Sequence, residues 1–404
     1  MSRSQRLFGR ANAVFPGGVN SPVRYYPPYP RYMRRGEGPY LQDVDGRKYA
    51  DYVLGYGPLI LGHSEGGVVN ALHRVARNGM IFGAPAPDEV ALAEMIGKYC
   101  PSLERMRFVA SGSEATMHAL RLAIHHTGRK KIVKMEGGYH GTHTLNYRSD
   151  IVDEVGFNSI NELERKLSGK EYAAVIIEPA LGNAGFIPPE KDYLQSVREL
   201  CNRYGSLLVC DEVITGFRTR FGLYSEAAGV EPDIVTLGKI IGGGMPLALY
   251  GGRDDVMRDV KPAGSFPQAG TYAAHPVSVA AGLKTLDILR RKDYGYLRHL
   301  SEIAAEKLLS SGLCVTSDTG MVSLFFTRGK VTDYRDVRAI DHSLFPKLFR
   351  LALDEGIFIP PSQEETIFIS FSHTQKMVSD NFSFIAEMAE NIYRSRRDRS
   401  LINS

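Results

Sequence analysis

The chain of 404 residues contains no tryptophan and only four cysteines, which are Cys100, Cys201, Cys210 and Cys314. These cysteines are scattered, without a C-x-x-C pair or a neighbouring group of histidines, which argues against a disulfide framework and a zinc site. No apolar run is long enough for a membrane span, and the N-terminal segment lacks the apolar core of a signal peptide. We therefore expect a cytoplasmic protein with no metal and no membrane partner.

The chain also lacks a large excess of either charge. Its 49 basic and 45 acidic residues leave a formal net charge of +4. A nucleic-acid-binding protein usually carries a much stronger basic surplus. We expect a small-molecule ligand as the partner, with no nucleic acid, and the mild surplus favours an anionic one.

Two phosphate-binding motifs are missing as well. No G-x-G-x-x-G fingerprint follows the first expected strand, which argues against a dinucleotide. The P-loop needs G-K-[ST], whereas Gly238-Lys239 is followed by isoleucine.

What the chain does have is a change of pattern along its length. Residues 1–50 are rich in Gly, Pro, Tyr and Arg and are expected to form an extended arm that ends in a hairpin at Asp45-Gly46. Residues 51–290 alternate apolar runs with amphipathic stretches, which predicts a large α/β domain. Residues 291–404 predict a smaller α+β domain in the order helix, strand, strand, helix, strand, strand, helix, which packs with the arm and shares a sheet with it.

The expected sheet of the large domain is mostly parallel. Six segments have strand length, namely RFVAS, KIVKM, AAVIIEP, SLLVCDE, DIVTLGK and LALYGG. Several are apolar on both faces, as are strands that helices cover from both sides. Helices are expected between them at Glu114–His126 and Asp192–Tyr204.

Unusual residues follow these strands where they end. They are Ser111-Gly112-Ser113, the run from Gly137 to Gly141, Glu178, Asp211 and Lys239. In an open parallel sheet, ligands bind at the carboxyl ends of the strands. The sequence therefore predicts one ligand site to which all five segments contribute.

Each member also has a purely structural interpretation. Ser111-Gly112-Ser113-Glu114 is either a helix cap or a phosphate site at a helix N-terminus. Asp211 needs a cationic partner, which is either a protonated pyridine nitrogen or an arginine such as Arg218. Tyr139 offers a flat face for a ring, although a core tyrosine with a satisfied hydroxyl is commoner in general. His140 is more commonly structural, and Glu178 is suited to capping a loop or bonding to backbone.

Lys239 is the most informative residue because lysine is rarely placed after a buried strand in a glycine-rich bend. Burial lowers the pKa of an amine and leaves it able to condense with an aldehyde. We therefore predict that Lys239 is the Schiff-base lysine of a pyridoxal-phosphate enzyme.

Together these segments resemble the class III, fold-type I aminotransferases, from about Arg10 to His373. The run DEVITGFR from Asp211 to Arg218, followed by Gly238-Lys239, carries this resemblance. Four further segments resemble the aminomutases of that family, which exchange an amine and an aldehyde within one molecule. They are FPGGVNSPVR from Phe15, GNAGFIPP from Gly182, TLGKIIGGGMP from Thr236 and PPSQEE from Pro360.

The resemblance implies the fold of the pyridoxal-phosphate-dependent transferases of fold type I, with pyridoxal 5'-phosphate interconverting with pyridoxamine 5'-phosphate, and a homodimer with active sites at the subunit interface. It implies Lys239 as the catalytic lysine. The implied cofactor-binding residues are Gly112, Ser113, Tyr139, Asp211, Val213 and Lys239, with Gly270 and Thr271 reaching the phosphate of the second subunit. The implied substrate-binding residues are Ser21, Arg24, Tyr56, Asn183 and Glu365.

Three features depart from the aminomutase pattern. The loop after Gly141 is shorter than the family's glycine-rich gating loop, Tyr56 stands where a tryptophan is usual, and Thr271 is followed by Tyr-Ala-Ala-His-Pro. An intermolecular aminotransferase or racemase with the same cofactor is therefore the alternative function, and a fold relative that binds a phosphorylated ligand without catalysis is a third.

Overall fold

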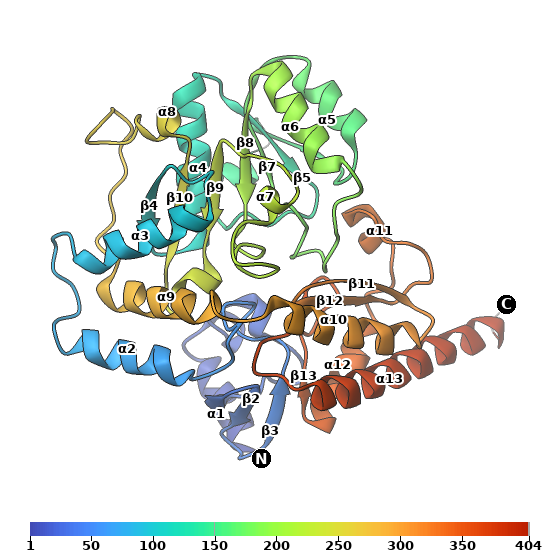
Figure 1. The fold of residues 1–404 in the computed structure, drawn as a ribbon. Coiled ribbons are helices and arrows are strands. Elements are labelled where there is room, and N and C mark those ends of the chain that lie inside the picture. Colours follow the sequence, from blue (N-terminus) through green and yellow to red (C-terminus); the bar gives the residue numbers. More distant parts are fainter. Residues whose placement is uncertain (149, 403–404) are drawn as a thin grey trace.

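The largest element of the computed structural model, which describes residues 1–148 and 150–402, is a seven-stranded sheet (Figure 1). Its order is β4 (Arg105–Val109), β10 (Ala248–Gly252), β9 (Ile234–Leu237), β8 (Leu207–Asp211), β7 (Tyr172–Ile177), β5 (Lys131–Met135) and β6 (Val152–Val155). Strand β10 runs antiparallel to both its neighbours, and the strands from β9 to β6 are parallel. The expected α/β fold with a mostly parallel sheet is confirmed.

Helices cover both faces of this sheet. In β7, Ala174 and Ile176 belong to the core that includes α4 (Gly112–Thr127), whereas Val175 and Ile177 belong to the core that includes α6 (Tyr193–Tyr204). Since successive side chains of a strand point to opposite faces, both sides of β7 are apolar. This is why AAVII is a continuous apolar run in the sequence, and each large apolar side chain buried in this way contributes about 1.5–3 kcal/mol.

This region contains further α-helices, and not all of them lie against the sheet (Figure 1). They are α2 (Gly66–Ala76), α3 (Pro87–Tyr99), α5 (Ile160–Leu167), α7 (Tyr224–Ala227), α8 (Asp254–Met257) and α9 (Pro276–Leu289). Helix α9 packs against α2 and α3, and α5 packs against α6. Helix α2 lies beyond α9 and away from the sheet (Figure 1).

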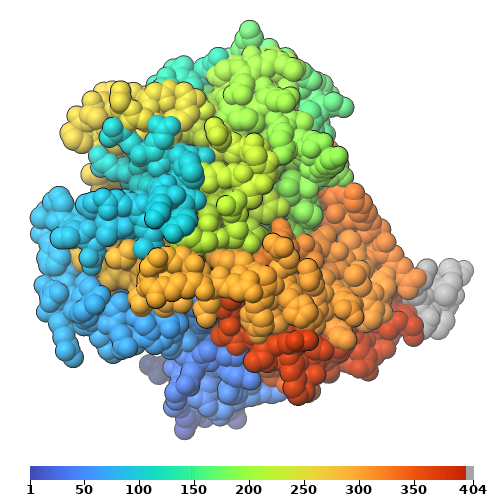
Figure 2. Space-filling view, viewed as in Figure 1, coloured from blue at the N-terminus to red at the C-terminus, as the bar shows by residue number. Residues whose placement is uncertain are grey.

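The N-terminal arm and the C-terminal region share a second sheet. Strands β1 (Met33–Glu37), β2 (Tyr40–Asp43) and β3 (Lys48–Asp51) form an antiparallel meander, and β13 (Ile357–Phe358) pairs with β3 in parallel. Gly46 has φ +94° in the turn between β2 and β3, as the predicted hairpin requires. Figure 2 shows the arm lying directly against the C-terminal part of the chain.

The rest of the C-terminal region follows the predicted order of elements except for one additional short helix, α11 (Tyr334–Arg338), before α12 (Phe345–Glu355). It also contains α10 (Tyr294–Leu309), the antiparallel sheet of β11 (Cys314–Asp318), β12 (Met321–Phe325) and β14 (Ile367–Phe368), and α13 (Gln375–Ile402). The division of the chain at residues 50 and 290 stays a prediction. Within the described ranges, no helix combines the length and apolarity that crossing a bilayer requires.

Two expectations about secondary structure were wrong. The arm is not extended throughout, because α1 (Arg3–Ala11) forms behind an N-cap in which Ser2 Oγ accepts a hydrogen bond from Gln5 N at 3.1 Å. The sequence analysis also placed no strand between Gly141 and the helix at Ile160, where β6 forms. Strand β6 lies at the edge of the sheet, and its side chains are too polar to give the apolar run by which the other strands were found.

Candidate active site

Lys239 lies at the carboxyl end of β9, at the start of a 3-10 turn from Lys239 to Gly242. Its φ is +47°, a left-handed conformation that side-chain-bearing residues rarely adopt, so the backbone here is held by its surroundings. Burial lowers the pKa of the Lys239 amine to about 8, and the positive charge of Arg218 acts in the same direction. A substantial fraction of neutral amine is therefore present near neutral pH.

Asp211 ends β8 and is almost fully buried. Its Oδ2 lies 2.8 Å from His140 Nδ1, and its Oδ1 accepts hydrogen bonds from Thr236 Oγ1 at 2.9 Å and Val213 N at 3.2 Å. Of the two cationic partners considered for Asp211, the arginine alternative, Arg218, was wrong. That guanidinium instead donates to the carbonyl oxygens of Ile214 and Gly57 and lies over the Phe368 ring.

His140 is buried with Asp211, and its tautomer follows from this contact. Because a carboxylate only accepts, Nδ1 carries the hydrogen that lies between the two side chains. Nε2 has no hydrogen-bond partner among the described residues. His140 thus holds Oδ2 of Asp211, and Thr236 and Val213 hold Oδ1, so the side chain is fixed at the end of β8.

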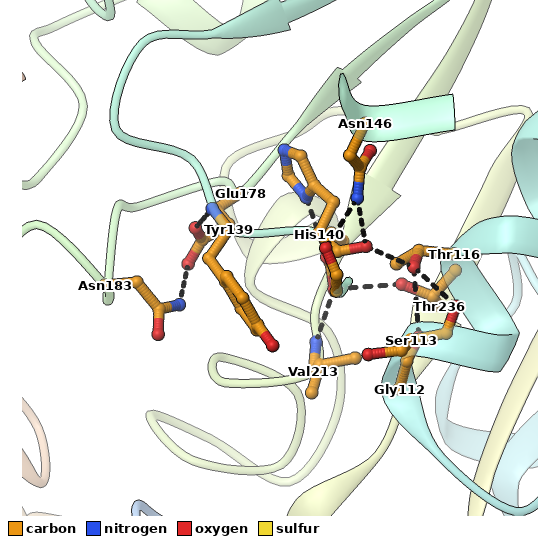
Figure 3. A network of polar contacts seen from close by, with 12 residues as sticks. Gly112, Ser113, Thr116, Tyr139, His140, Asn146, Glu178, Asn183, Val213 and Thr236 are labelled. Carbon is orange, nitrogen blue, oxygen red and sulfur yellow. Dashed lines mark hydrogen bonds and ion pairs between the residues drawn. The ribbon is translucent and has the colours of Figure 1, made fainter. Parts of the chain in front are cut away.

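Tyr139 and Glu178 are joined across the ends of β5 and β7. Tyr139 N donates to Glu178 Oε1 at 2.9 Å, and the tyrosine ring is half exposed (Figure 3). Glu178 Oε2 accepts from Gly182 N at 3.0 Å and from Asn183 Nδ2 at 3.4 Å. The prediction that Glu178 bonds to backbone is confirmed. Burial raises the pKa of its carboxyl to about 7, and nearby Asp211 adds to that rise while His140 opposes it.

The segment Ser111-Gly112-Ser113 forms the start of α4. Ser111 is the N-cap, and its Oγ accepts from Glu114 N at 3.2 Å, so the cap interpretation is confirmed. Glu114 turns back toward β4, where its carboxylate accepts from Ala110 N at 2.9 Å. The free N–H groups of the first turn and the Ser113 hydroxyl are therefore not opposed by that carboxylate, and an anion is compatible with this end of the helix.

The helix start, Asp211 and Lys239 meet around Val213. A Cβ added to Gly112 would lie 3.2 Å from the Val213 methyl groups, and one added to Gly238 would lie 3.3 Å from them. Figure 3 shows Val213 close to Ser113 and Gly112, with Tyr139 on the other side of the same space. The structure thus brings Gly112, Ser113, Tyr139, Asp211, Val213 and Lys239 to one edge of the sheet.

The sequence analysis missed residues that fix this edge. Thr116 Oγ1 and Asn146 Nδ2 both donate to His140 O, at 2.6 and 2.7 Å, and Thr236 binds Asp211 (Figure 3). Nothing in their types marks them, because threonine and asparagine are common on helices and loops. Only their positions could have indicated them: Thr116 lies one turn after Ser113, Asn146 lies on the short loop after Gly141, and Thr236 lies shortly before Lys239.

Two of the predicted substrate-pocket residues, Arg24 and Tyr56, line a cavity of about 540 Å³ beneath the N-terminal arm. Tyr56, at φ +65°, donates its hydroxyl hydrogen to Val23 O. Asn183 is placed by Glu178, as described above. Ser21 starts the 3-10 turn that ends at Arg24 but does not line this cavity.

Glu365 lines a neighbouring cavity of about 470 Å³ together with Pro22 and Val23. Burial raises the pKa of the Glu365 carboxyl to about 7, and the charge of Lys239 opposes that rise. Glu365 is therefore close enough to Lys239 for the two groups to influence each other's charge.

Gly270 and Thr271 are exposed. A Cβ on Gly270 would lie 3.4 Å from Glu114 Oε1, so this loop contacts the first turn of α4. Their contribution to a second subunit's site stays a prediction.

Comparison with known proteins places this geometry in a family. The model of the class-III aminotransferases matches residues 22–149 and 142–374. A glutamate-1-semialdehyde 2,1-aminomutase of Thermoplasma volcanium is 42% identical over 405 residues, which cover 92% of this chain and 95% of the relative.

Solved structures agree with this placement. An omega-transaminase from Sphaerobacter thermophilus superimposes with a TM-score of 0.90 at 31% identity, covering 96% of this chain and 98% of that one. A transaminase with PLP bound superimposes with a TM-score of 0.89 at 26% identity, covering 98% and 99%. The chain belongs to the class III aminotransferases.

Proposed function

We propose that this protein is a glutamate-1-semialdehyde 2,1-aminomutase, which converts glutamate 1-semialdehyde to 5-aminolevulinate for tetrapyrrole biosynthesis. The observation that carries the proposal is the full-length similarity to such an enzyme, at 42% identity. The arm supports it, since FPGGVNSPVR brings Arg24 into a cavity with Tyr56. The reaction is an isomerisation, in which an amine and an aldehyde exchange places within one carbon chain.

The residues at the sheet edge fit pyridoxal phosphate as the cofactor. The N–H groups at the start of α4, with the Ser113 hydroxyl, suit a phosphate. Asp211 offers a carboxylate to a protonated pyridine nitrogen, and that charge keeps the ring able to accept electrons. The glycines at 112 and 238 leave room beside Val213 that a Cβ would narrow, which suits a flat ring.

When bound, pyridoxal phosphate and its pyridoxamine form supply an electron sink and a carrier for the amino group. Lys239 would bind the aldehyde of this cofactor and would carry protons to and from the substrate, and its lowered pKa favours the neutral amine that this needs. Asp211 would pair with the ring nitrogen in its protonated state. Val213 and Tyr139 would contact the ring.

On the substrate side, Arg24 is suited to a carboxylate because its planar guanidinium binds two oxygens at once. Ser21, Tyr56, Asn183 and Glu365 complete the proposed pocket. Tyr56 also ties the arm to the pocket through Val23 O, which helps to keep the arm over the site.

The decisive experiment gives the purified holoenzyme glutamate 1-semialdehyde without any second amine donor. We expect 5-aminolevulinate to form, and the Lys239→Ala variant to form none. If product appears only when an external amine is added, the aminomutase proposal is wrong.

An intermolecular class III aminotransferase or racemase acting on another amino acid is the second candidate. The short segment between Gly141 and β6 favours it, because a smaller lid retains a diamine less well. The similarity to an omega-transaminase over nearly the whole chain also favours it. Transfer of an amino group from an added amine to a keto acid, faster than formation of 5-aminolevulinate, would establish this alternative.

We also propose that the enzyme is a homodimer whose active sites lie at the subunit interface, with Gly270 and Thr271 reaching the cofactor phosphate of the partner. The exposed apolar side chains of Met80, Ile81 and Phe82 support association. Light scattering of the holoenzyme tests the dimer. A monomer with full activity would contradict it.

A further inference from the structure

Two consecutive residues, Tyr139 and His140, are both involved in the expected contacts to the cofactor ring. Tyr139 is expected to stack on the ring, and His140 orients Asp211, which is expected to bind the ring nitrogen. Tyr139 N donates to Glu178 Oε1 at 2.9 Å, and His140 Nδ1 lies 2.8 Å from Asp211 Oδ2. The residue expected to stack on the ring and the residue that orients the carboxylate for the ring nitrogen are thus neighbours in the chain. A displacement of this short backbone segment moves both contacts together.

The same backbone segment is held on its other side through the carbonyl oxygen of His140. His140 O accepts hydrogen bonds from Thr116 Oγ1 at 2.6 Å and from Asn146 Nδ2 at 2.7 Å, and Asn146 Nδ2 also donates to Gly141 O at 2.9 Å (Figure 3). Both donors also contact His143 Nε2, at 3.3 and 3.2 Å, and burial lowers the pKa of that histidine, which keeps it neutral. The hydrogen bond that holds Tyr139 N, in contrast, has the carboxyl group of Glu178 as its acceptor.

Glu178 reaches the substrate pocket with its second oxygen. Oε2 accepts from Gly182 N at 3.0 Å and from Asn183 Nδ2 at 3.4 Å. A carboxylate accepts on both oxygens at once, whereas the protonated acid carries a hydrogen on one of them and loses acceptor capacity there. Tyr139 and Asn183 are thus held at a fixed separation only while Glu178 is charged.

The charge of Glu178 is balanced by the groups that face it. His140 favours the carboxylate, Asp211 disfavours it, and the two backbone N–H groups of Tyr139 and Gly182 favour it. The charge of Glu178 also raises the pKa values of Lys239 and Glu365. Because burial alone opposes ionisation, the carboxylate depends on this set of contacts.

From this arrangement we propose that Glu178 is a positioning residue, which as a carboxylate holds the stacking side chain of Tyr139 and the pocket side chain of Asn183 in register. The inference rests on the proposed cofactor but not on the identity of the substrate. If Glu178 has this role, both the affinity for the cofactor and the position of Asn183 in the substrate pocket depend on the buried charge of Glu178. Glu178 itself contacts neither the cofactor nor the substrate.

The test compares Glu178→Gln with Glu190→Gln, whose exposed side chain pairs with Lys330. The amide at position 178 is permanently neutral and directs an N–H group at one of the two backbone N–H donors. We expect the dissociation constant of pyridoxal phosphate to rise about tenfold or more, because hydrogen bonds to charged groups are the stronger ones. Glu190→Gln should match the wild type.

The spectrum of the bound cofactor separates positioning from mere stability. The visible band of wild-type holoenzyme is recorded from pH 6 to pH 9, with the cofactor dissociation constant at each pH. Wild-type affinity should weaken as pH falls below about 7, where Glu178 gains a proton, whereas Glu178→Gln should be weak across the range. A variant with wild-type affinity and an unchanged band at every pH would overturn the proposal, whatever its melting temperature.

Asn183→Ala keeps the proposal testable if Glu178→Gln does not fold. It removes only the pocket end of the network, so we expect KM for substrate to rise with little change in cofactor affinity. Equal changes in KM and cofactor affinity, or no change in either, would contradict the proposal that Glu178 positions Asn183 in the substrate pocket. A protein that never binds pyridoxal phosphate would instead refute the proposed function itself, and an enzyme that binds it but lacks aminomutase activity leaves the role of Glu178 intact.

Discussion

Gly141 and Ser113 are in direct contact at the carboxyl edge of the sheet, so closely that a Cβ on Gly141 would lie 2.6 Å from Ser113 Cα. Gly141 also has φ +86°, where a side chain is strained. The loop that carries Tyr139 and His140 thus rests on the helix start proposed to bind the cofactor phosphate. Glycine is required here for the close approach as well as for the turn.

Gly141→Ala should therefore weaken cofactor binding more than it weakens the fold. The matched control is Gly128→Ala at the end of α4, which has a similar positive φ of +67° but nothing within 4 Å of its added Cβ. Both substitutions should lower the melting temperature, and only Gly141→Ala should raise the dissociation constant of pyridoxal phosphate, by about tenfold or more. Equal cofactor affinity in the two variants would show that the contact with Ser113 has no functional consequence.

Asp211→Asn should leave the cofactor bound but catalytically weak. The amide preserves the shape of a side chain held by Thr236 and Val213, while removing the charge that keeps a pyridine nitrogen protonated. We expect kcat to fall at least about 100-fold, since loss of the ring charge removes most of the electron sink. Asp380→Asn, an exposed change on α13, is the control and should be fully active. A fall of less than twofold for Asp211→Asn would exclude this role.

The lowered pKa of Lys239 predicts how cofactor capture depends on pH. Only the neutral amine attacks an aldehyde, so the rate of condensation of added pyridoxal phosphate with cofactor-free enzyme should rise with pH and reach half its maximum near pH 8. Borohydride reduction followed by peptide mapping identifies the lysine. Lys239→Arg should trap no cofactor at this site. A half-maximum near pH 10 would mean that burial and Arg218 do not affect the amine as proposed.

The sequence was sufficient to predict which residues lie at the carboxyl edge of the sheet, but it did not indicate which of their side chains form hydrogen bonds with one another. Asp211 and Lys239 follow apolar strands that had to be neighbours in a covered sheet, so their shared edge followed from the pattern. The partner of Asp211 did not follow, because His140 is 71 residues away and a histidine after a glycine pair has many structural uses. Arg218, seven residues from Asp211 along the chain, is turned instead toward carbonyl oxygens.

The arm shows a similar limit. The resemblance marked Arg24 and Tyr56 as pocket residues, yet only the coordinates join them through Val23 O and one cavity. Helix α1 and strand β6 escaped prediction because their side chains are too polar to contrast with the surrounding segments. Such elements are formed by capping and by pairing with a neighbour, and both depend on contacts that a single local pattern does not contain.

Glu365→Gln should stabilise the cofactor-free protein more at pH 8 than at pH 5. The pKa of Glu365 is raised from 4.5 to about 7 in the folded protein, chiefly by burial. Between these two values the folded state binds more protons than the unfolded state, so the free energy of unfolding falls as the pH rises through this window. The contribution is complete below about pH 4.5 and is lost above about pH 7, whereas a glutamine does not titrate.

The difference in unfolding free energy between Glu365→Gln and the wild type should therefore increase by about 1–2 kcal/mol from pH 5 to pH 8, less than full burial would give because the carboxyl is only partly shielded. Glu178 titrates in the same window and its charge raises the pKa of Glu365, so the difference also contains the interaction between these two carboxyl groups. Urea unfolding at each pH measures this quantity, with Glu355→Gln at the exposed end of α12 as the control. A difference that stays constant or falls with pH would mean that Lys239 already compensates the charge of Glu365, and that the two residues form an ion pair before any substrate binds.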